Sequence, residues 1–159
     1  MKKIILILLL FVSLCIKAQV QTNNLINKFV GTWQWVSNTD TVKIVLEKQV
    51  YNLQLTGVQS EILVGWHKYV KNGVVIENSM QYVGLDINTD YNSSDVHMKT
   101  TLSGTSRGAN KAWFDTFWSL TELRSNELSL EMLPNSTTQA KWKLKGSSPM
   151  PSDLILTKQ

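Results

Sequence analysis

The sequence is poor in the side chains that build covalent and metal-dependent sites. Among its 159 residues are one cysteine and two histidines. Cys15 lies inside the N-terminal apolar segment, so a chain that loses this segment forms no disulfide and has no cysteine nucleophile. His67 and His97 stand alone, without the ordered spacing that a zinc site requires, and we expect both to be exposed or partly packed. We therefore expect no metal and no cofactor.

Recognisable catalytic motifs are also lacking. The chain contains no G-x-S-x-G nucleophile elbow and no P-loop. The stretch Gly104–Gly108 is rich in glycine, but it has neither the lysine nor the following helix of a phosphate cradle. Asp115, between aromatic residues, and His67 are the candidates for an enzymatic site. The simpler interpretation of Asp115 is an outward strand position paired with a lysine such as Lys111, so we expect a protein that is not an enzyme.

Only one long hydrophobic run is present, and it is short for a membrane span. It covers residues 4–16, follows Lys2 and Lys3, and ends at Lys17-Ala18-Gln19. A spanning helix needs about 20 apolar residues, whereas a basic start, a short apolar run and a small residue are typical of a signal peptide. We predict a signal peptide over residues 1–18 and an exported domain over residues 19–159, periplasmic or secreted, without stable membrane insertion. A retained anchor and lipidation of Cys15 are the alternatives.

The positive net charge does not indicate a nucleic-acid partner. The formal charge is +4, from 16 basic and 12 acidic residues. Three of the lysines lie in the predicted signal peptide, so 13 basic residues remain against 12 acidic ones in the domain. A net charge near +1 favours neither nucleic acid nor an anionic membrane as a partner.

What the chain does contain is the alternating pattern of half-buried strands. Residues 42–46, 128–132 and 140–144 alternate apolar with polar side chains, and Asn72-Gly73 is the strongest hairpin signal. We predict a further strand over residues 80–87 and a short turn of helix in the polar lead before Gly31. No other segment has a helical period. We predict an all-β domain of about eight to ten antiparallel strands, closed as an up-and-down barrel, with a sandwich as the alternative.

Charge on two of these segments predicts a strand pairing. Lys141, Lys143 and Lys145 form a basic stripe, and Glu127 and Glu131 lie on the preceding strand. Opposite charges on directly opposed residues stabilise a sheet by roughly 0.2–1 kcal/mol per pair. We therefore expect these two strands to be antiparallel neighbours with the stripe on the outside.

The stretch Val30-Gly31-Thr32-Trp33, which opens the first long strand, carries a family resemblance. Together with the hairpin over residues 68–77 and the closing Leu154–Lys158, it resembles the lipocalins and the wider calycin group. More specifically, it is similar to small exported lipocalin-like domains from Bacteroidota that have no assigned function. The resemblance implies that Gly31 and Trp33 form a structural motif. In it, Trp33 packs across the closed barrel end beneath a basic side chain, which here would be Lys141, Lys143 or Arg124.

Six tryptophans are the main chemical feature of the domain. Buried aromatic faces in a barrel either fill the core or line a ligand cavity, and both interpretations remain open. The leading hypothesis is non-enzymatic binding of a small apolar or amphipathic ligand. The predicted lining consists of Trp35, Trp66, Tyr82, Met98, Phe114, Trp118, Met132 and Trp142. The alternative is a module that binds a glycan or a cell-envelope protein through exposed aromatics such as Trp113 and Tyr91.

Overall fold

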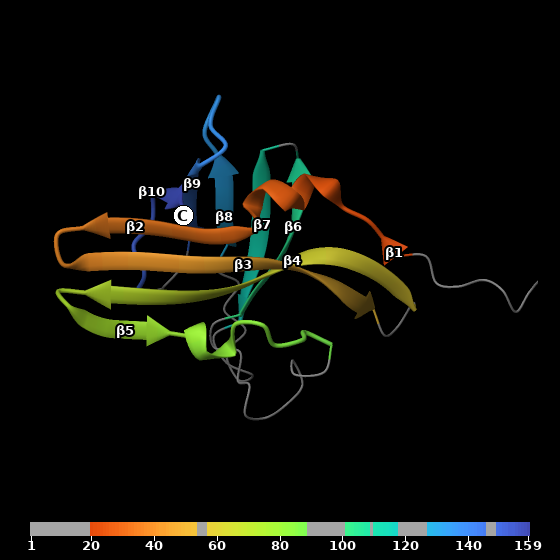
Figure 1. Ribbon diagram of the computed structural model, residues 1–159, viewed down its shortest axis with the longest axis horizontal. Coiled ribbons are helices and arrows are strands. Elements are labelled where there is room, and N and C mark those ends of the chain that lie inside the picture. Colours follow the sequence, from red (N-terminus) through yellow and green to blue (C-terminus); the bar gives the residue numbers. More distant parts are fainter. Residues whose placement is uncertain (1–19, 54–56, 89–100, 109, 118–126, 146–148) are drawn as a thin grey trace, which may run out of the picture.

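The protein forms one curled β-sheet whose strand pairings return to their starting point (Figure 1). The computed structural model describes residues 20–53, 57–88, 101–108, 110–117, 127–145 and 149–159, with the backbone alone at 53, 101–108, 115–117 and 127. The strands are β1 (Val20–Gln21), β2 (Gly31–Ser37), β3 (Asp40–Leu53), β4 (Val58–Lys71), β5 (Val74–Asn78), β6 (Thr101–Gly108), β7 (Lys111–Phe117), β8 (Glu127–Met132), β9 (Gln139–Lys145) and β10 (Leu154–Lys158). Two short 3-10 helices, η1 (Asn24–Phe29) and η2 (Met80–Tyr82), complete the described part.

Eight of the strands pair in a ring. In order around the ring they are β4, β3, β2, β10, β9, β8, β7 and β6, and β6 pairs with β4 again. Every pairing in the ring is antiparallel, and apart from the excursion through β5 each strand lies beside its neighbour in the chain. This is the predicted up-and-down barrel. Two seams are short: β10 and β2 share two residue pairs, and β4 and β6 share three.

The charged stripes of β8 and β9 set the register that the sequence predicts. Glu127 lies opposite Lys145, and Glu131 lies opposite Lys141. Leu130 and Trp142 are opposed on the other face and are buried. Because side chains alternate across a strand, this register puts the charged positions of both strands on one face of the sheet and the large apolar positions on the other. The predicted antiparallel pairing is confirmed.

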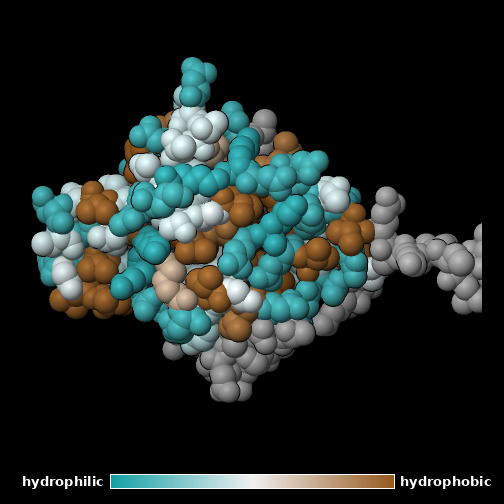
Figure 2. All heavy atoms as spheres, viewed as in Figure 1, coloured by the Kyte–Doolittle hydropathy of each residue, from teal (hydrophilic) through white to brown (hydrophobic). Residues whose placement is uncertain are grey.

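The turn at Asn72-Gly73 also forms as predicted. Asn72 has a φ of 51° and Gly73 a φ of 76°, the left-handed values that a type I′ hairpin turn needs. The resulting β4–β5 hairpin projects with β2 and β3 beyond the upright strands β6 to β8 (Figure 1). Val36, Val74 and Val75 are exposed there, and hydrophobic surface is visible at the projecting end in Figure 2.

Strand β4 is buried on both faces. The sequence predicts Trp66 in the barrel lining and a strand over residues 80–87, and the structure corrects both predictions. Leu63 and Tyr69 belong to the core inside the barrel, whereas Trp66 belongs to a separate cluster on the outer face. The segment after β5 covers this outer cluster. It is not the predicted strand but η2 followed by turns, held by Gln49, whose side chain accepts from Ile87 N and donates to Leu85 O.

The main core joins η1 to the inner faces of the barrel strands. Trp33 and Trp142 are its largest fully buried side chains, and Phe29 of η1 is fully buried with them. Each aromatic side chain of this size buries about 150–250 Å², so these rings supply much of the apolar stabilisation. The smaller side chains of Ala112 and Ala140 leave room for them on the inner faces of β7 and β9. This core closes the end of the barrel at which β2 begins.

The lead into η1 is tied to β4 through Glu61. Its carboxylate accepts a hydrogen bond of 2.8 Å from the backbone N–H of Asn23, the N-cap residue of η1, and forms a 2.9 Å ion pair with Lys48. The Asn23 N–H first, and the Lys48 ammonium second, hold the pKa of Glu61 below its ordinary value, although partial burial opposes them. β1 pairs with β4 in parallel just before this point.

The Glu61 contacts predict acid-sensitive anchoring of the lead. Because the folded pKa lies below the ordinary value of 4.5, this contribution is fully present above that pH and is lost as pH falls through the folded pKa. Glu61→Gln should therefore lower the free energy of unfolding at neutral pH and reduce its fall below about pH 4.5. Urea unfolding from pH 7 to pH 3 measures this. Glu47→Gln, on the outer face of β3, is the control; equal pH profiles for Glu61→Gln and the wild type would contradict the assignment.

Candidate functional site

Gly31 allows two segments from opposite ends of the chain to touch. Its φ is +124°, a conformation that residues with a side chain rarely adopt. A Cβ atom at this position would lie 2.9 Å from Cε of Lys158 on β10. The backbone conformation thus requires a glycine here, and an added Cβ would also force the lysine stem to shift.

Lys158 is the basic side chain that covers Trp33. Its Nζ lies 5.5 Å from the centre of the Trp33 ring and donates a 3.0 Å hydrogen bond to the carbonyl oxygen of Lys28. The indole N–H of Trp33 donates to the carbonyl oxygen of Phe29 at 2.7 Å. These contacts fasten the end of η1 to β2 and β10.

The lysine over Trp33 is not one of the three predicted candidates. Lys141 and Lys143 lie on the outer face of β9, and Arg124 lies outside the described residues. The sequence did contain a signal for Lys158. Leu154 and Leu156 alternate with exposed residues and are buried, which places Lys158 on the inward face of the same strand.

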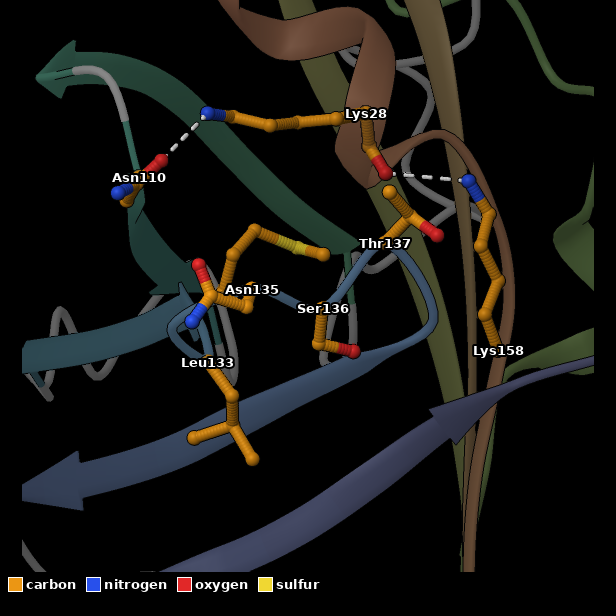
Figure 3. Close-up of a pocket in the computed structure, with 8 residues that line it drawn as sticks. Lys28, Asn110, Leu133, Asn135, Ser136, Thr137 and Lys158 are labelled. Carbon is orange, nitrogen blue, oxygen red and sulfur yellow. Dashed lines mark hydrogen bonds between the residues drawn. The ribbon is translucent and has the colours of Figure 1, made fainter.

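A pocket of about 330 Å³ lies beside this contact (Figure 3). It is bounded by η1, the β6–β7 turn, the β8–β9 turn and the end of β10. Met132 and Leu133 provide an apolar part of its wall. The polar lining consists of Lys28, Asn110, Asn135, Ser136, Thr137 and Lys158. A wall with a few converging polar groups is typical of small-molecule sites, whose volumes are about 300–1,000 Å³.

The turn that carries three of the polar groups is held by its own hydrogen bonds. Ser136 Oγ accepts from the backbone N–H of Thr138 and, at 2.9 Å, from that of Gln139. Ser136 N donates to the carbonyl oxygen of Leu133, and Asn135 has a φ of 59°. The turn therefore presents the side chains of Asn135 and Thr137 from a fixed backbone.

Four residues of the predicted ligand lining lie within or against the main core. Phe114, Met132 and Trp142 are buried in it, and Trp35 is partly buried against it. Met132 also lines the end pocket, so among the described residues of the predicted set it is the one that the structure brings to this site. The pairs Met132–Ala140 and Leu130–Trp142 are successive inward pairs of β8 and β9, which places Trp142 one step deeper in the barrel.

The other four residues of the predicted lining fall into two groups. Trp66 and Tyr82 pack in the outer cluster over β4, because the segment after β5 covers a face that the alternation rule assigned to the lumen. Met98 and Trp118 lie outside the described residues. Tyr91, predicted as an exposed aromatic, also lies outside them, whereas Trp113 is exposed as the alternative hypothesis requires.

His67 is fully buried, whereas the sequence predicts an exposed or partly packed side chain. Its Nε2 lies 2.9 Å from a carboxylate oxygen of Glu77 on β5, and its backbone N–H donates to Ser79 Oγ at 2.8 Å. Tyr69, two residues along β4, is also buried. Burial first, and then the carboxylates of Asp40 and Glu77, raise the pKa of Tyr69.

The other predicted sites can be placed only in part. Asp115 lies on β7 opposite Glu127, and its side chain is outside the described ones; His97 falls outside the described residues altogether. Among the residues described, no group of three or more His, Cys, Asp and Glu side chains could hold a metal ion. Within the same part of the chain, no helix is long and apolar enough to cross a membrane.

Comparison with known proteins gives one family. Residues 1–159, the whole chain, match the model of a family of unknown function, DUF6705. The chain belongs to this family. No curated protein and no solved structure matches the chain significantly.

The contact between Gly31 and Lys158 predicts an unequal cost of two glycine substitutions. Gly31→Ala should destabilise the protein by about 2–4 kcal/mol, because it adds a steric clash to backbone strain. Gly57→Ala should cost only about 1–2 kcal/mol, since Gly57 has a φ of +66° and no atom within 4 Å of the added Cβ. Chemical denaturation measures both. Lys158→Ala should reduce the cost of Gly31→Ala in a double-mutant cycle, and strict additivity would show that the clash is absent.

Proposed function

We propose that this domain is a non-enzymatic binding protein for a small amphipathic molecule. The observation that supports this best is the pocket of about 330 Å³, in which Met132 and Leu133 adjoin hydrogen-bonding groups. The volume lies at the lower end of the range for small-molecule sites, so the occupant is a compact molecule. The site lies at the closed end of the barrel, beside Met132 of the predicted lining.

A buried polar atom inside the barrel also supports binding of a ligand or an ordered water. The indole N–H of Trp142 is buried and has no acceptor among the described residues. Buried donors in native proteins are nearly always paired with protein, water or another molecule. Trp142 lies one inward pair below Met132, a residue of the pocket wall.

The predicted kinship with lipocalins belongs to the same proposal. The closed ring of eight strands and the stacking of Lys158 on Trp33 beside Gly31 support it. Membership among exported Bacteroidota domains, and export itself, remain predictions from the N-terminal segment and the strand-opening motif. On this reading DUF6705 is a lipocalin-like family whose members carry ligands outside the cytoplasm.

Binding of a glycan or an envelope protein through Trp113 is the second candidate. Its ring lies on the outer face of β7 and is 38% exposed. The ammonium of Lys111 lies 4.4 Å from the ring centroid, while Lys111 also forms a 3.3 Å ion pair with Glu131. A sugar stacking on Trp113 would therefore have to use the remaining ring surface beside this charged pair.

Occlusion of the pocket distinguishes the two candidates. The full chain would be expressed, purified under native conditions and compared by native and denaturing mass spectrometry. We expect a bound mass that is lost on denaturation, and that Thr137→Trp, at the pocket rim, lowers its occupancy at least about tenfold because the indole fills the site. Thr39→Trp, an exposed substitution in the β2–β3 turn, is the matched control.

Two results would contradict the pocket as the ligand site. In the first, Thr137→Trp retains the same bound mass as the wild type. In the second, the wild type is bare and its tryptophan fluorescence does not change with a panel of compact amphiphiles. Binding of an oligosaccharide that Trp113→Ala abolishes and Thr137→Trp leaves intact would instead support the surface module.

A further inference from the structure

Two positive charges without ionic partners line the end pocket. Lys28 reaches it from η1 and Lys158 reaches it from β10 (Figure 3). Each remaining member of the lining is neutral: three amide or hydroxyl residues of the β8–β9 turn, Asn110, Met132 and Leu133. Among the described residues, neither lysine forms an ion pair. The two side chains therefore bring two formal positive charges to the described wall of the pocket.

Both ammonium groups are positioned by neutral contacts. Lys28 Nζ donates a 3.1 Å hydrogen bond to Asn110 Oδ1 and lies 5.5 Å from the centre of the Phe29 ring. Lys158 Nζ donates to the carbonyl oxygen of Lys28 and lies over the Trp33 ring. An ammonium group has three N–H donors, so each lysine retains donors that these single acceptors do not use. Both cations are thus held at the site with hydrogen-bonding capacity remaining.

This arrangement favours an anion over a neutral or cationic group. A carboxylate accepts several hydrogen bonds, and those from ammonium donors are roughly twice as strong as bonds between neutral groups. The Lys28–Asn110 bond is exposed to solvent, so an incoming anion can reach this ammonium without opening the core. The apolar side chains of Met132 and Leu133 lie in the same pocket, where a hydrocarbon portion can contact them.

We propose that the end pocket binds a short carboxylate amphiphile, with its carboxylate at the solvent-accessible ammonium of Lys28 and its hydrocarbon against Met132 and Leu133. Lys158 adds a second positive charge on the other side of the pocket (Figure 3). This inference rests on the proposed function and names the ligand class for that site. The volume of about 330 Å³ favours a short chain over a long membrane lipid. Among amphiphiles of equal length, the positive charge of the pocket favours the one with an anionic polar group.

Three single-chain probes of nearly equal length and with different polar ends test the selection. Octanoate, 1-octanol and octyltrimethylammonium would be titrated into the purified full chain by isothermal calorimetry in low salt. We expect octanoate to bind roughly tenfold or more tightly than 1-octanol, and the cation to bind most weakly. Added sodium chloride should weaken octanoate binding more than 1-octanol binding, because salt screens charge attraction at a solvent-accessible site.

Lysine variants assign the preference to this pocket. Lys28→Gln should reduce the preference for octanoate over 1-octanol about fivefold or more, because it keeps the side-chain length and removes one cation. Lys143→Gln makes the same change in net charge on the outer face of β9 and should leave the preference unchanged. Lys28 is the better probe because Lys158 also supports Trp33, and thermal unfolding of both variants checks that they fold.

The outcomes separate this inference from the proposed function. Equal binding of octanoate and 1-octanol, with loss of both in Thr137→Trp, would keep the amphiphile site and overturn its charge selection. An octanoate preference that Lys28→Gln and Lys143→Gln reduce equally would also overturn it, because the effect would follow net charge. Absence of binding by all three probes to the wild type would overturn both proposals.

Discussion

The contact between β2 and β10 is the constraint on which the rest of the structure depends. Only two residue pairs join these strands, yet without them both would be open edges and the aromatic core would face solvent at the seam. Side chains strengthen the seam. Lys158 covers Trp33 and bonds the end of η1, while its backbone N–H donates to the carbonyl oxygen of Thr138 at 2.7 Å. The same few contacts close the barrel and form the wall of the pocket.

The features predictable from the sequence are those that neighbouring residues decide. Alternation identified the strands, Asn72-Gly73 specified its hairpin, and charge fixed the register of β8 against β9. Strand β4 was harder because it is buried on both faces, so its alternation did not reveal which face points into the barrel. The apolar residues of the segment around Ile87 resembled a strand, but they cover Trp66 from outside. Tertiary packing decided these cases.

The candidate site was less predictable because no single segment contains it. It takes one lysine from the lead, one from the last strand, and small polar residues from two turns. In the sequence, these residue types are the ones common in solvent-exposed loops. The periodicity of β10 was the usable signal, since it places a lysine where the two preceding inward residues are leucines. Attention to aromatic side chains instead directed the prediction toward the centre of the barrel, where most of them pack as core.

Strand order around the ring also determines when the barrel can be completed. β10 follows every other strand of the ring in the chain, so β2 has one unpaired edge until β10 reaches it. Contacts between such distant segments carry a large loop-closure entropy and form slowly. A chain in which β2 to β9 were paired before β10 docked would expose two strand edges and the apolar interior, and such surfaces promote association. The last few residues of β10 thus cover the edges that strand order leaves open longest.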